Sequence, residues 1–170
     1  MTNIGIIGNG FVGNAVAKGF ASFIDDIKIY DTNLKRRTHN ILDTINSDFV
    51  FVCLPTPMVD AEGGECNLSI IEDFFDMLEK DDLTENNPIF IIKSTVPIGT
   101  TRKLQEKHSW LNIIHNPEFL TAVNAEEDFL NAERTVIGGN CLDSLEIVED
   151  LYNKYFPNIP VVATIIFVTI

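Results

Sequence analysis

Three glycines near the start of the chain have the spacing of a phosphate-binding turn. Gly8, Gly10 and Gly13 form a G-x-G-x-x-G motif directly after the apolar run at residues 3–7. In a turn from strand to helix, the first glycine permits the tight turn, the second lets a pyrophosphate approach the backbone, and the third lets the helix pack closely on the strand. The free N–H groups at the helix start, with its positive dipole end, then hold the phosphates. The motif therefore predicts a dinucleotide site.

An acidic residue lies where such a site needs one. Asp31 lies 18 residues after Gly13, at the end of a second apolar run at residues 27–30. A carboxylate there accepts hydrogen bonds from the two ribose hydroxyls of adenosine and repels a 2′-phosphate, so we expect NAD rather than NADP. The alternative is a glycine-rich turn in an unrelated α/β domain, with Asp31 as an ordinary residue at a strand end. The helical pattern of residues 11–23 favours the dinucleotide site.

The segment after Asp31 is polar and basic. It includes Lys35, Arg36 and Arg37. A solvated surface segment is the favoured interpretation, because charged side chains usually face water. The alternative is that Lys35 or Arg36 lies beside the adenine or the ribose.

The rest of the chain alternates between short apolar strands and amphipathic helices. This alternation predicts a Rossmann-like, doubly wound α/β fold, with a mainly parallel sheet and helices on both faces. We expect residues 1–170 to form a single NAD(P)-binding domain of this kind. Strands are predicted at residues 3–7, 27–30, 49–54, 88–92, 111–115, 134–139 and 159–170. Helices are predicted at residues 11–23, 41–46, 67–80, 100–108 (capped by Thr100 or Thr101) and 143–155.

Composition and charge argue against several classes of protein. The 170 residues are 45% hydrophobic and 22% charged, which is typical of one globular domain. With 12 basic and 25 acidic residues, the net charge is −13, which argues against nucleic acid and anionic membranes as partners. The start of the chain has no signal-peptide pattern, and Cys53, Cys66 and Cys141 form no metal-binding pattern. We therefore expect a cytoplasmic protein with reduced thiols and no metal.

The end of the sequence is almost wholly apolar. Residues 159–170 are too few for a transmembrane helix, which needs ~20 residues, so a final strand is expected. Residues 165–170 would leave an uncovered apolar strand, and such strands pair with other chains. We expect self-association or binding to a partner chain through this segment, which light scattering would detect.

Further motifs carry a resemblance to a known family. Residues 54–57 (LPTP), 93–101 (KSTVPIGTT) and 116–120 (NPEFL) each follow or end a predicted strand. The other matching pieces are residues 8–13, Asp31, Asp128-Phe129 and residues 134–138. Taken in order, the motifs resemble the N-terminal NAD-binding domain of the UDP-glucose/GDP-mannose dehydrogenase family. The resemblance extends over this chain from residue 4 to about residue 164. The motifs at 93–101 and 116–120 are the most specific part of the match.

The resemblance implies an NAD-dependent oxidation. Enzymes of this family oxidise C6 of a nucleotide sugar to a carboxylate in two hydride transfers, through a cysteine-bound thiohemiacetal and thioester. The residues implied at the pyrophosphate are Gly8, Gly10, Phe11, Val12 and Gly13, and Asp31 is implied at the adenosine ribose. The residues implied along the NAD are Pro55, Thr56, Pro57, Ser94 and Thr95.

The resemblance also implies residues for the chemistry and the sugar. Thr95 would help to position the water that hydrolyses the thioester, and Glu118 would act as an acid/base or water-orienting group. Glu118, Phe119 and Leu120 would border the sugar. Structural alternatives remain, with Thr95 as a turn hydroxyl and Glu118 as a helix-start carboxylate after Pro117.

Several family residues have no counterpart in this sequence. The nucleophilic cysteine of the family, and its oxyanion-stabilising lysine and asparagine, belong to segments after the first domain, the central helix among them. The three cysteines here lie in other motifs, and Ala122 stands where the family often has an acid. We therefore expect no activity from the chain alone. It would be the NAD-binding half of a nucleotide-sugar dehydrogenase, completed by another chain, or else a non-catalytic NAD-binding module or truncated remnant. A third possibility is the oxidation scheme of hydroxyacid dehydrogenases. It would not give an active chain either, because it needs a catalytic lysine from a following domain.

Overall fold

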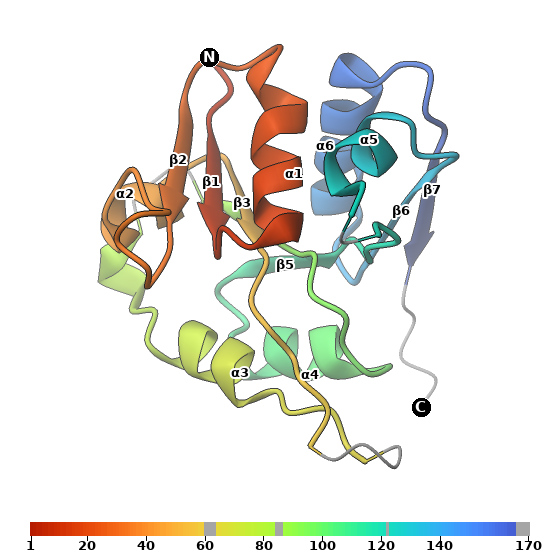
Figure 1. The fold of residues 1–170 in the computed structure, drawn as a ribbon. Coiled ribbons are helices and arrows are strands. Elements are labelled where there is room, and N and C mark those ends of the chain that lie inside the picture. Colours follow the sequence, from red (N-terminus) through yellow and green to blue (C-terminus); the bar gives the residue numbers. More distant parts are fainter. Residues whose placement is uncertain (60–63, 84–86, 122, 166–170) are drawn as a thin grey trace.

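Seven short apolar segments form one sheet with helices on both faces (Figure 1). The computed structural model describes residues 1–59, 64–83, 87–121 and 123–165. The strands, in the sheet order β2-β1-β3-β4-β5-β6-β7, are β1 (Ile4–Ile7), β2 (Ile27–Tyr30), β3 (Phe49–Val52), β4 (Ile89–Ile92), β5 (Asn112–His115), β6 (Thr135–Gly139) and β7 (Val161–Ile165). The helices are α1 (Phe11–Ala21), α2 (Ile41–Ile45), α3 (Ser69–Asp76), α4 (Thr100–Lys107), α5 (Ala125–Leu130) and α6 (Leu142–Tyr155), with a short 3-10 helix at Lys80–Asp82. The predicted Rossmann-like α/β fold is confirmed.

Side chains of the central strands alternate between two hydrophobic cores. In β3, Phe51 packs in a core with α1, α5 and α6, whereas Val50 and Val52 pack in a core with α3 and α4. Figure 1 shows α1, α5 and α6 together, apart from α3 and α4. Because β1, β3 and β4 are buried on both faces, each is a nearly continuous apolar run.

The parallel part of the sheet determines where the functional loops meet. β1 pairs in parallel with both β2 and β3, and β4 and β5 continue the parallel order. The carboxyl ends of these strands therefore lie at one edge, and the strand order reverses between β1 and β3. In open α/β sheets, ligands bind in the crevice outside the strand ends at such a reversal. The loops after β1, β3, β4 and β5 all start at this edge.

The last two strands, β6 and β7, run opposite to the first five. β6 is antiparallel to β5, with His115 opposite Gly138, and β7 is parallel to β6. The side-chain Nδ2 of Asn116, directly after β5, donates a hydrogen bond to Val136 O at 2.7 Å. The chain thus re-enters the sheet close to where β5 ended, which requires the reversed direction. The prediction of a mainly parallel sheet holds, although the pattern of residues 134–139 did not indicate this reversal.

Helix α5 was not predicted, because its segment is mostly polar. Only two of its side chains, Ala125 and Phe129, are buried, four residues apart on one side of the helix. They pack on α1, where the Phe129 ring occupies the space beside Gly19. A Cβ at position 19 would lie 2.3 Å from that ring, so the glycine is what lets the two helices approach. Packing rather than local pattern stabilises this helix.

Some predicted element ends were wrong. Helix α4 is capped by Gly99, whose φ of +89° suits glycine, and both Thr100 and Thr101 lie buried in the first turn. Helix α3 ends at Asp76 rather than at residue 80. The predicted last strand is confirmed at Val161–Ile165, and residues 166–170, with most of the expected association segment, lie outside the described residues.

Candidate functional site

The glycine turn has the geometry that its spacing predicted. Gly8 has a φ of +90°, and a Cβ there would lie 2.5 Å from Cys53 O. A Cβ on Gly13 would lie 2.0 Å from Gly8 O, so α1 packs directly on the turn. A Cβ on Gly10 would meet no atom within 4 Å. The first and third glycines are therefore required by the fold, whereas the second borders open space where a ligand can approach.

Asp31 ties the end of β2 to this turn. Its Oδ2 accepts a hydrogen bond from Asn9 N at 2.7 Å, and its Oδ1 accepts one from Asn33 N at 2.7 Å. The Asn9 side chain in turn donates to Arg36 O at 2.7 Å. The carboxylate is thus held in a fixed orientation beside the turn, with lone pairs left for a ligand.

A cavity of about 810 Å³ opens between the glycine turn and the loops after β3, β4 and β5. We call it the glycine-turn cavity. The predicted site residues that line it are Gly8, Gly10, Phe11, Val12, Asp31, Pro55, Thr56, Ser94, Thr95, Glu118 and Leu120. Arg36 lines it as well, whereas Lys35 lines a smaller neighbouring cavity, so of these two candidates Arg36 is the one placed at the predicted ribose site. Gly13, Pro57 and Phe119 are not among its lining residues.

Two hydroxyl groups hold the cavity loops together. Ser94 Oγ donates to Leu54 O at 2.7 Å, and Thr56 Oγ1 donates to Thr95 O at 2.7 Å. The loops after β3 and β4 therefore lie side by side at the sheet edge. The Thr95 side chain is exposed at the cavity. The fold thus brings together the two motifs that are 39 residues apart in the chain.

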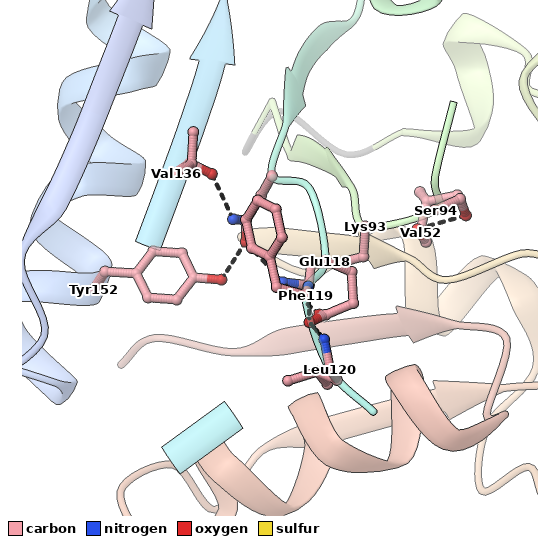
Figure 2. Close-up of polar contacts among 9 residues, drawn as sticks. Val52, Lys93, Ser94, Glu118, Phe119, Leu120, Val136 and Tyr152 are labelled. Atoms are coloured by element: carbon pink, nitrogen blue, oxygen red, sulfur yellow. Dashed lines mark hydrogen bonds and ion pairs between the residues drawn. The ribbon is translucent and has the colours of Figure 1, made fainter. Parts of the chain in front are cut away.

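A buried ion pair, shown in Figure 2, contributes both of its side chains to the lining of the glycine-turn cavity. Lys93 Nζ lies 2.9 Å from Glu118 Oε2, and the two side chains are only 5% and 10% exposed. Glu118 Oε1 accepts hydrogen bonds from the backbone N–H groups of Phe119 and Leu120, at 2.7 and 2.8 Å. Each carboxylate oxygen therefore has a fixed partner, and the group is held in one orientation.

Lys93 was not predicted as a site residue, although its motif was singled out. Two signals were available in the sequence. Lys93 directly follows β4, and Glu118 lies in the loop after the neighbouring strand β5. Side chains that follow adjacent parallel strands meet at the same sheet edge, and a lone lysine there needs an acidic partner.

A second pair of buried polar residues supports the ion pair (Figure 2). Asn116 Oδ1 accepts hydrogen bonds from the Tyr152 hydroxyl and from Lys93 Nζ, the latter at 3.2 Å. Burial raises the pKa of the Tyr152 hydroxyl well above its usual value, and the negative charge of Glu118 adds to this, so Tyr152 remains a hydrogen-bond donor. The sequence indicated only an inward-facing position on its helix for Tyr152.

A second cavity, of about 730 Å³, lies on the other side of this cluster. We call it the Tyr152 cavity. Its walls include Asn116, Phe119, Asp128 and Tyr152. On one wall of this cavity, Thr121 donates two hydrogen bonds to the carboxylate of Asp128, and these hold the pKa of Asp128 below its usual value. Three residues, Lys93, Glu118 and Leu120, line both the Tyr152 cavity and the glycine-turn cavity. The two cavities are therefore neighbours across a single buried ion pair.

Comparison with known proteins identifies the family. The sequence profile of the "UDP-glucose/GDP-mannose dehydrogenase family, NAD binding domain" matches residues 28–156. The chain belongs to this family. It is an NAD-binding domain, as the glycine motif and Asp31 predicted.

Individual relatives agree with this assignment. The UDP-glucose 6-dehydrogenase of Rickettsia bellii is 37% identical over 112 residues, which is 63% of this chain and 25% of that protein. That of Rickettsia prowazekii is 29% identical over 185 residues, 88% of this chain and 42% of that protein. The chain thus spans less than half the length of these relatives.

Solved structures show the same fold. A UDP-glucose dehydrogenase from Pyrobaculum islandicum superposes with a TM-score of 0.76 at 22% identity, covering 96% of this chain and 46% of that one. A ternary complex of GDP-mannose dehydrogenase from Pseudomonas aeruginosa gives a TM-score of 0.74 at 20% identity, covering 97% and 47%. At these identities the likeness establishes the fold of the NAD-binding domain.

Among the described residues, no group of three or more histidine, cysteine, aspartate or glutamate side chains is placed to hold a metal ion. Within the same residues, no helix has the length and apolar character needed to span a bilayer. Ala122, which replaces an acid of the family, lies outside the described residues.

Cys53 lines the glycine-turn cavity, yet its surroundings disfavour the reactive thiolate. Burial raises the pKa of the Cys53 thiol to about 12, while the positive charge of Lys93 acts in the opposite direction and is outweighed. A thiol with this pKa stays protonated at neutral pH, and only the thiolate is a good nucleophile.

Cys53 and Cys141 should therefore differ in reactivity. At pH 8 we expect iodoacetamide to modify the exposed Cys141 at least about a hundredfold faster than Cys53, because the thiolate fraction falls tenfold for each unit by which the pKa exceeds the pH. Mass spectrometry of digested protein after timed labelling measures both rates. Equal rates in the folded protein would contradict the protonated state of Cys53.

Proposed function

We propose that this chain is the NAD-binding part of a nucleotide-sugar 6-dehydrogenase, with NAD in the glycine-turn cavity and the sugar in the Tyr152 cavity. The observation that carries the proposal is the shared wall, since Lys93, Glu118 and Leu120 line both cavities. Hydride transfer requires the donor and acceptor atoms to be in contact, so an oxidoreductase needs adjoining sites. We also propose that residues 1–170 form one domain of that enzyme.

The glycine-turn cavity suits NAD in shape and in chemistry. The open space at Gly10 lies beside the start of α1, whose unpaired N–H groups suit a pyrophosphate. The oriented carboxylate of Asp31 suits the ribose hydroxyls, and Thr56 and Thr95 lie farther along the cavity. Bound NAD would accept the hydride from the sugar carbon. Pro57 lies outside the lining of this cavity, and for it we propose only a role in shaping the loop.

Glu118 and Thr95 are proposed to act on the water of the hydrolytic step. The Glu118 carboxylate is buried and oriented by Lys93 and by two backbone N–H groups, so it can accept a proton from a water as the water oxygen attacks a carbonyl carbon. The exposed hydroxyl of Thr95 on the same cavity can hold that water by a hydrogen bond. Phe119 and Leu120 line the Tyr152 cavity, where they are proposed to border the sugar.

A non-catalytic NAD-binding role is the second candidate. The state of Cys53 is compatible with this role, because a protonated thiol cannot replace the nucleophilic cysteine of the family. Under this candidate the chain binds NAD and takes no part in the turnover of a sugar. The two candidates share the cofactor site and differ in whether the Tyr152 cavity is used.

The first test is a fluorescence titration of the purified chain with NADH. Saturable binding in the micromolar range is expected. If NADH does not bind to a chain that circular dichroism shows to be folded, both candidates are contradicted. Addition of UDP-glucose or GDP-mannose to the NADH complex separates them. A shift in the amide resonances of Phe119 and Leu120 would support the sugar site, whereas unchanged resonances would favour the non-catalytic role.

Removal of the Asp31 carboxylate tests the ribose contact. Asp31→Ala should weaken NADH binding by about 1–2 kcal/mol, the scale of a lost charge-assisted hydrogen bond. Because Asp31 also accepts hydrogen bonds from Asn9 and Asn33, part of the loss could reflect a loosened loop.

A matched variant separates these effects. Thr38→Val removes the hydrogen bond from Ile29 N to Thr38 Oγ1, at 3.1 Å, in the same loop but outside the glycine-turn cavity. NADH affinity should change by less than twofold in this variant. Unchanged affinity in Asp31→Ala would remove Asp31 from the site, and equal losses in both variants would assign the effect to loop order.

A further inference from the structure

Three consecutive cations border the glycine turn without acidic partners. Lys35, Arg36 and Arg37 form no ion pair within the described parts of the chain, although the protein has a net charge of −13. They line a cavity of about 560 Å³ together with Asn9, Gly10, Phe11, Asn14 and Thr38. Gly10, Phe11 and Arg36 also line the glycine-turn cavity, so the two cavities adjoin. We call the smaller one the basic cavity.

The loop that carries these cations is held in place by its backbone. Arg36 N donates to Asn33 O at 2.9 Å, and Lys35 N donates to Asn33 Oδ1 at 3.0 Å. Asn9 Nδ2 donates to Arg36 O at 2.7 Å, which fixes the loop to the glycine turn. Thr38 N donates to Ile29 O at 2.9 Å, which fixes its other end to β2. The cations are therefore presented by an ordered loop, and less conformational freedom is lost when a ligand binds.

One acid opposes them. Asp31 lines the glycine-turn cavity but not the basic cavity, and each of its oxygens accepts a backbone hydrogen bond, from Asn9 N and from Asn33 N. The guanidinium of Arg37 lies over the Tyr30 ring, 5.8 Å from its centroid, which helps to orient it. Three positive charges thus line the basic cavity, and none of its described lining residues carries a carboxylate. The balance of charge favours an anion, and guanidinium groups suit phosphate oxygens.

We infer that the basic cavity is a second anion subsite, which takes the 2′-phosphate of an adenine dinucleotide, so that the domain binds NADPH as well as NADH. The inference rests on the proposed placement of NAD in the glycine-turn cavity. With the adenosine ribose at Asp31, a phosphate on its 2′ oxygen extends toward the loop of Lys35 to Arg37. An arginine near the acid at the end of β2 is a general way to accept this group. From the sequence, the Asp31 carboxylate favours NAD over NADP, and the three cations act against that preference.

The test compares NADPH with NADH on the intact chain by fluorescence titration. The dissociation constant for NADPH should lie within tenfold of that for NADH. If NADH binds and NADPH is more than tenfold weaker, the inference fails while the proposed function stands. If neither nucleotide binds to the folded chain, both fail.

Charge variants locate the subsite. Lys35→Gln/Arg37→Gln should weaken NADPH at least tenfold more than it weakens NADH, because both side chains line the basic cavity and not the glycine-turn cavity. Arg102→Gln/Lys103→Gln removes the same charge from α4, away from both cavities, and should leave the ratio of the two constants unchanged. A similar change of the ratio in both double variants would show a general charge effect and overturn the inference.

Small anions separate a 2′-phosphate subsite from a general phosphate site. Adenosine 2′,5′-bisphosphate should displace NADPH at concentrations at which inorganic phosphate does not. Equal displacement by inorganic phosphate would show that the cavity does not recognise the ribose-linked group, and it would overturn the inference.

Discussion

Gly13→Ala should lose NADH binding and much of the stability of the domain. The new Cβ would lie 2.0 Å from Gly8 O and 3.2 Å from Ile6 Cγ2, and the first of these atoms belongs to the backbone of the turn. Backbone cannot move aside as a side chain can, so α1 must shift away from β1. Overpacking costs about 1–3 kcal/mol, and we expect the upper end of this range because the clash is with backbone. Urea unfolding measures the loss of stability, and NADH titration measures the loss of binding.

Gly10→Ala is the matched variant, with the opposite balance of effects. A Cβ at this position meets nothing within 4 Å, so the free energy of unfolding should change by less than about 1 kcal/mol. NADH binding should nevertheless weaken at least tenfold, because the methyl group occupies the space through which the pyrophosphate approaches. Unchanged NADH affinity in Gly10→Ala would place the cofactor elsewhere.

The second large effect is expected at the buried ion pair. Lys93→Met leaves the Glu118 carboxylate in a site where its side chain is 10% exposed, with no opposite charge. Breaking a buried pair by removal of one partner costs about 3–5 kcal/mol, because the remaining charge is uncompensated. Lys93→Met should therefore lower the free energy of unfolding by this amount in urea at neutral pH.

Two comparisons show whether burial is the cause. Adding Glu118→Gln to Lys93→Met removes the stranded charge and should restore part of the stability. Lys18→Met breaks the ion pair of Lys18 with Glu126, at 2.6 Å, where both side chains are about half exposed, and should cost about 0–1 kcal/mol. If Lys93→Met is no more destabilising than Lys18→Met, burial does not raise the cost of breaking the pair of Lys93 with Glu118.

The geometry of the glycine turn and the position of Asp31 were predictable because these residues are close in sequence. The turn at Gly8, the open space at Gly10 and the close packing at Gly13 follow from three glycines within six residues. Asp31 could be placed because one helix and one short strand separate it from the turn, and their lengths determine its distance. The family motifs placed Thr95 and Glu118 at the same sheet edge, because both follow parallel strands.

The remaining features depend on contacts between distant segments. The reversal of β6 and the formation of α5 are decided by packing on β5 and α1, which the polar residues 121–134 do not reveal. The exposure and rigidity of the loop at residues 33–38 likewise depend on Asn9 and Ile29, to which its backbone is bonded.

The sequence by itself determined the fold class, the cofactor class and the edge of the sheet at which the motif loops meet, because strand alternation and the glycine motif are local signals. Only the tertiary structure decided that Lys93 pairs with Glu118, that Tyr152 and Asn116 support this pair, and that the pair separates two cavities. Tyr152 lies 36 residues from Asn116, and its pattern on α6 is that of an ordinary core residue. A buried polar contact forms where the fold leaves no water to satisfy the group, and that condition exists only after the chain has packed.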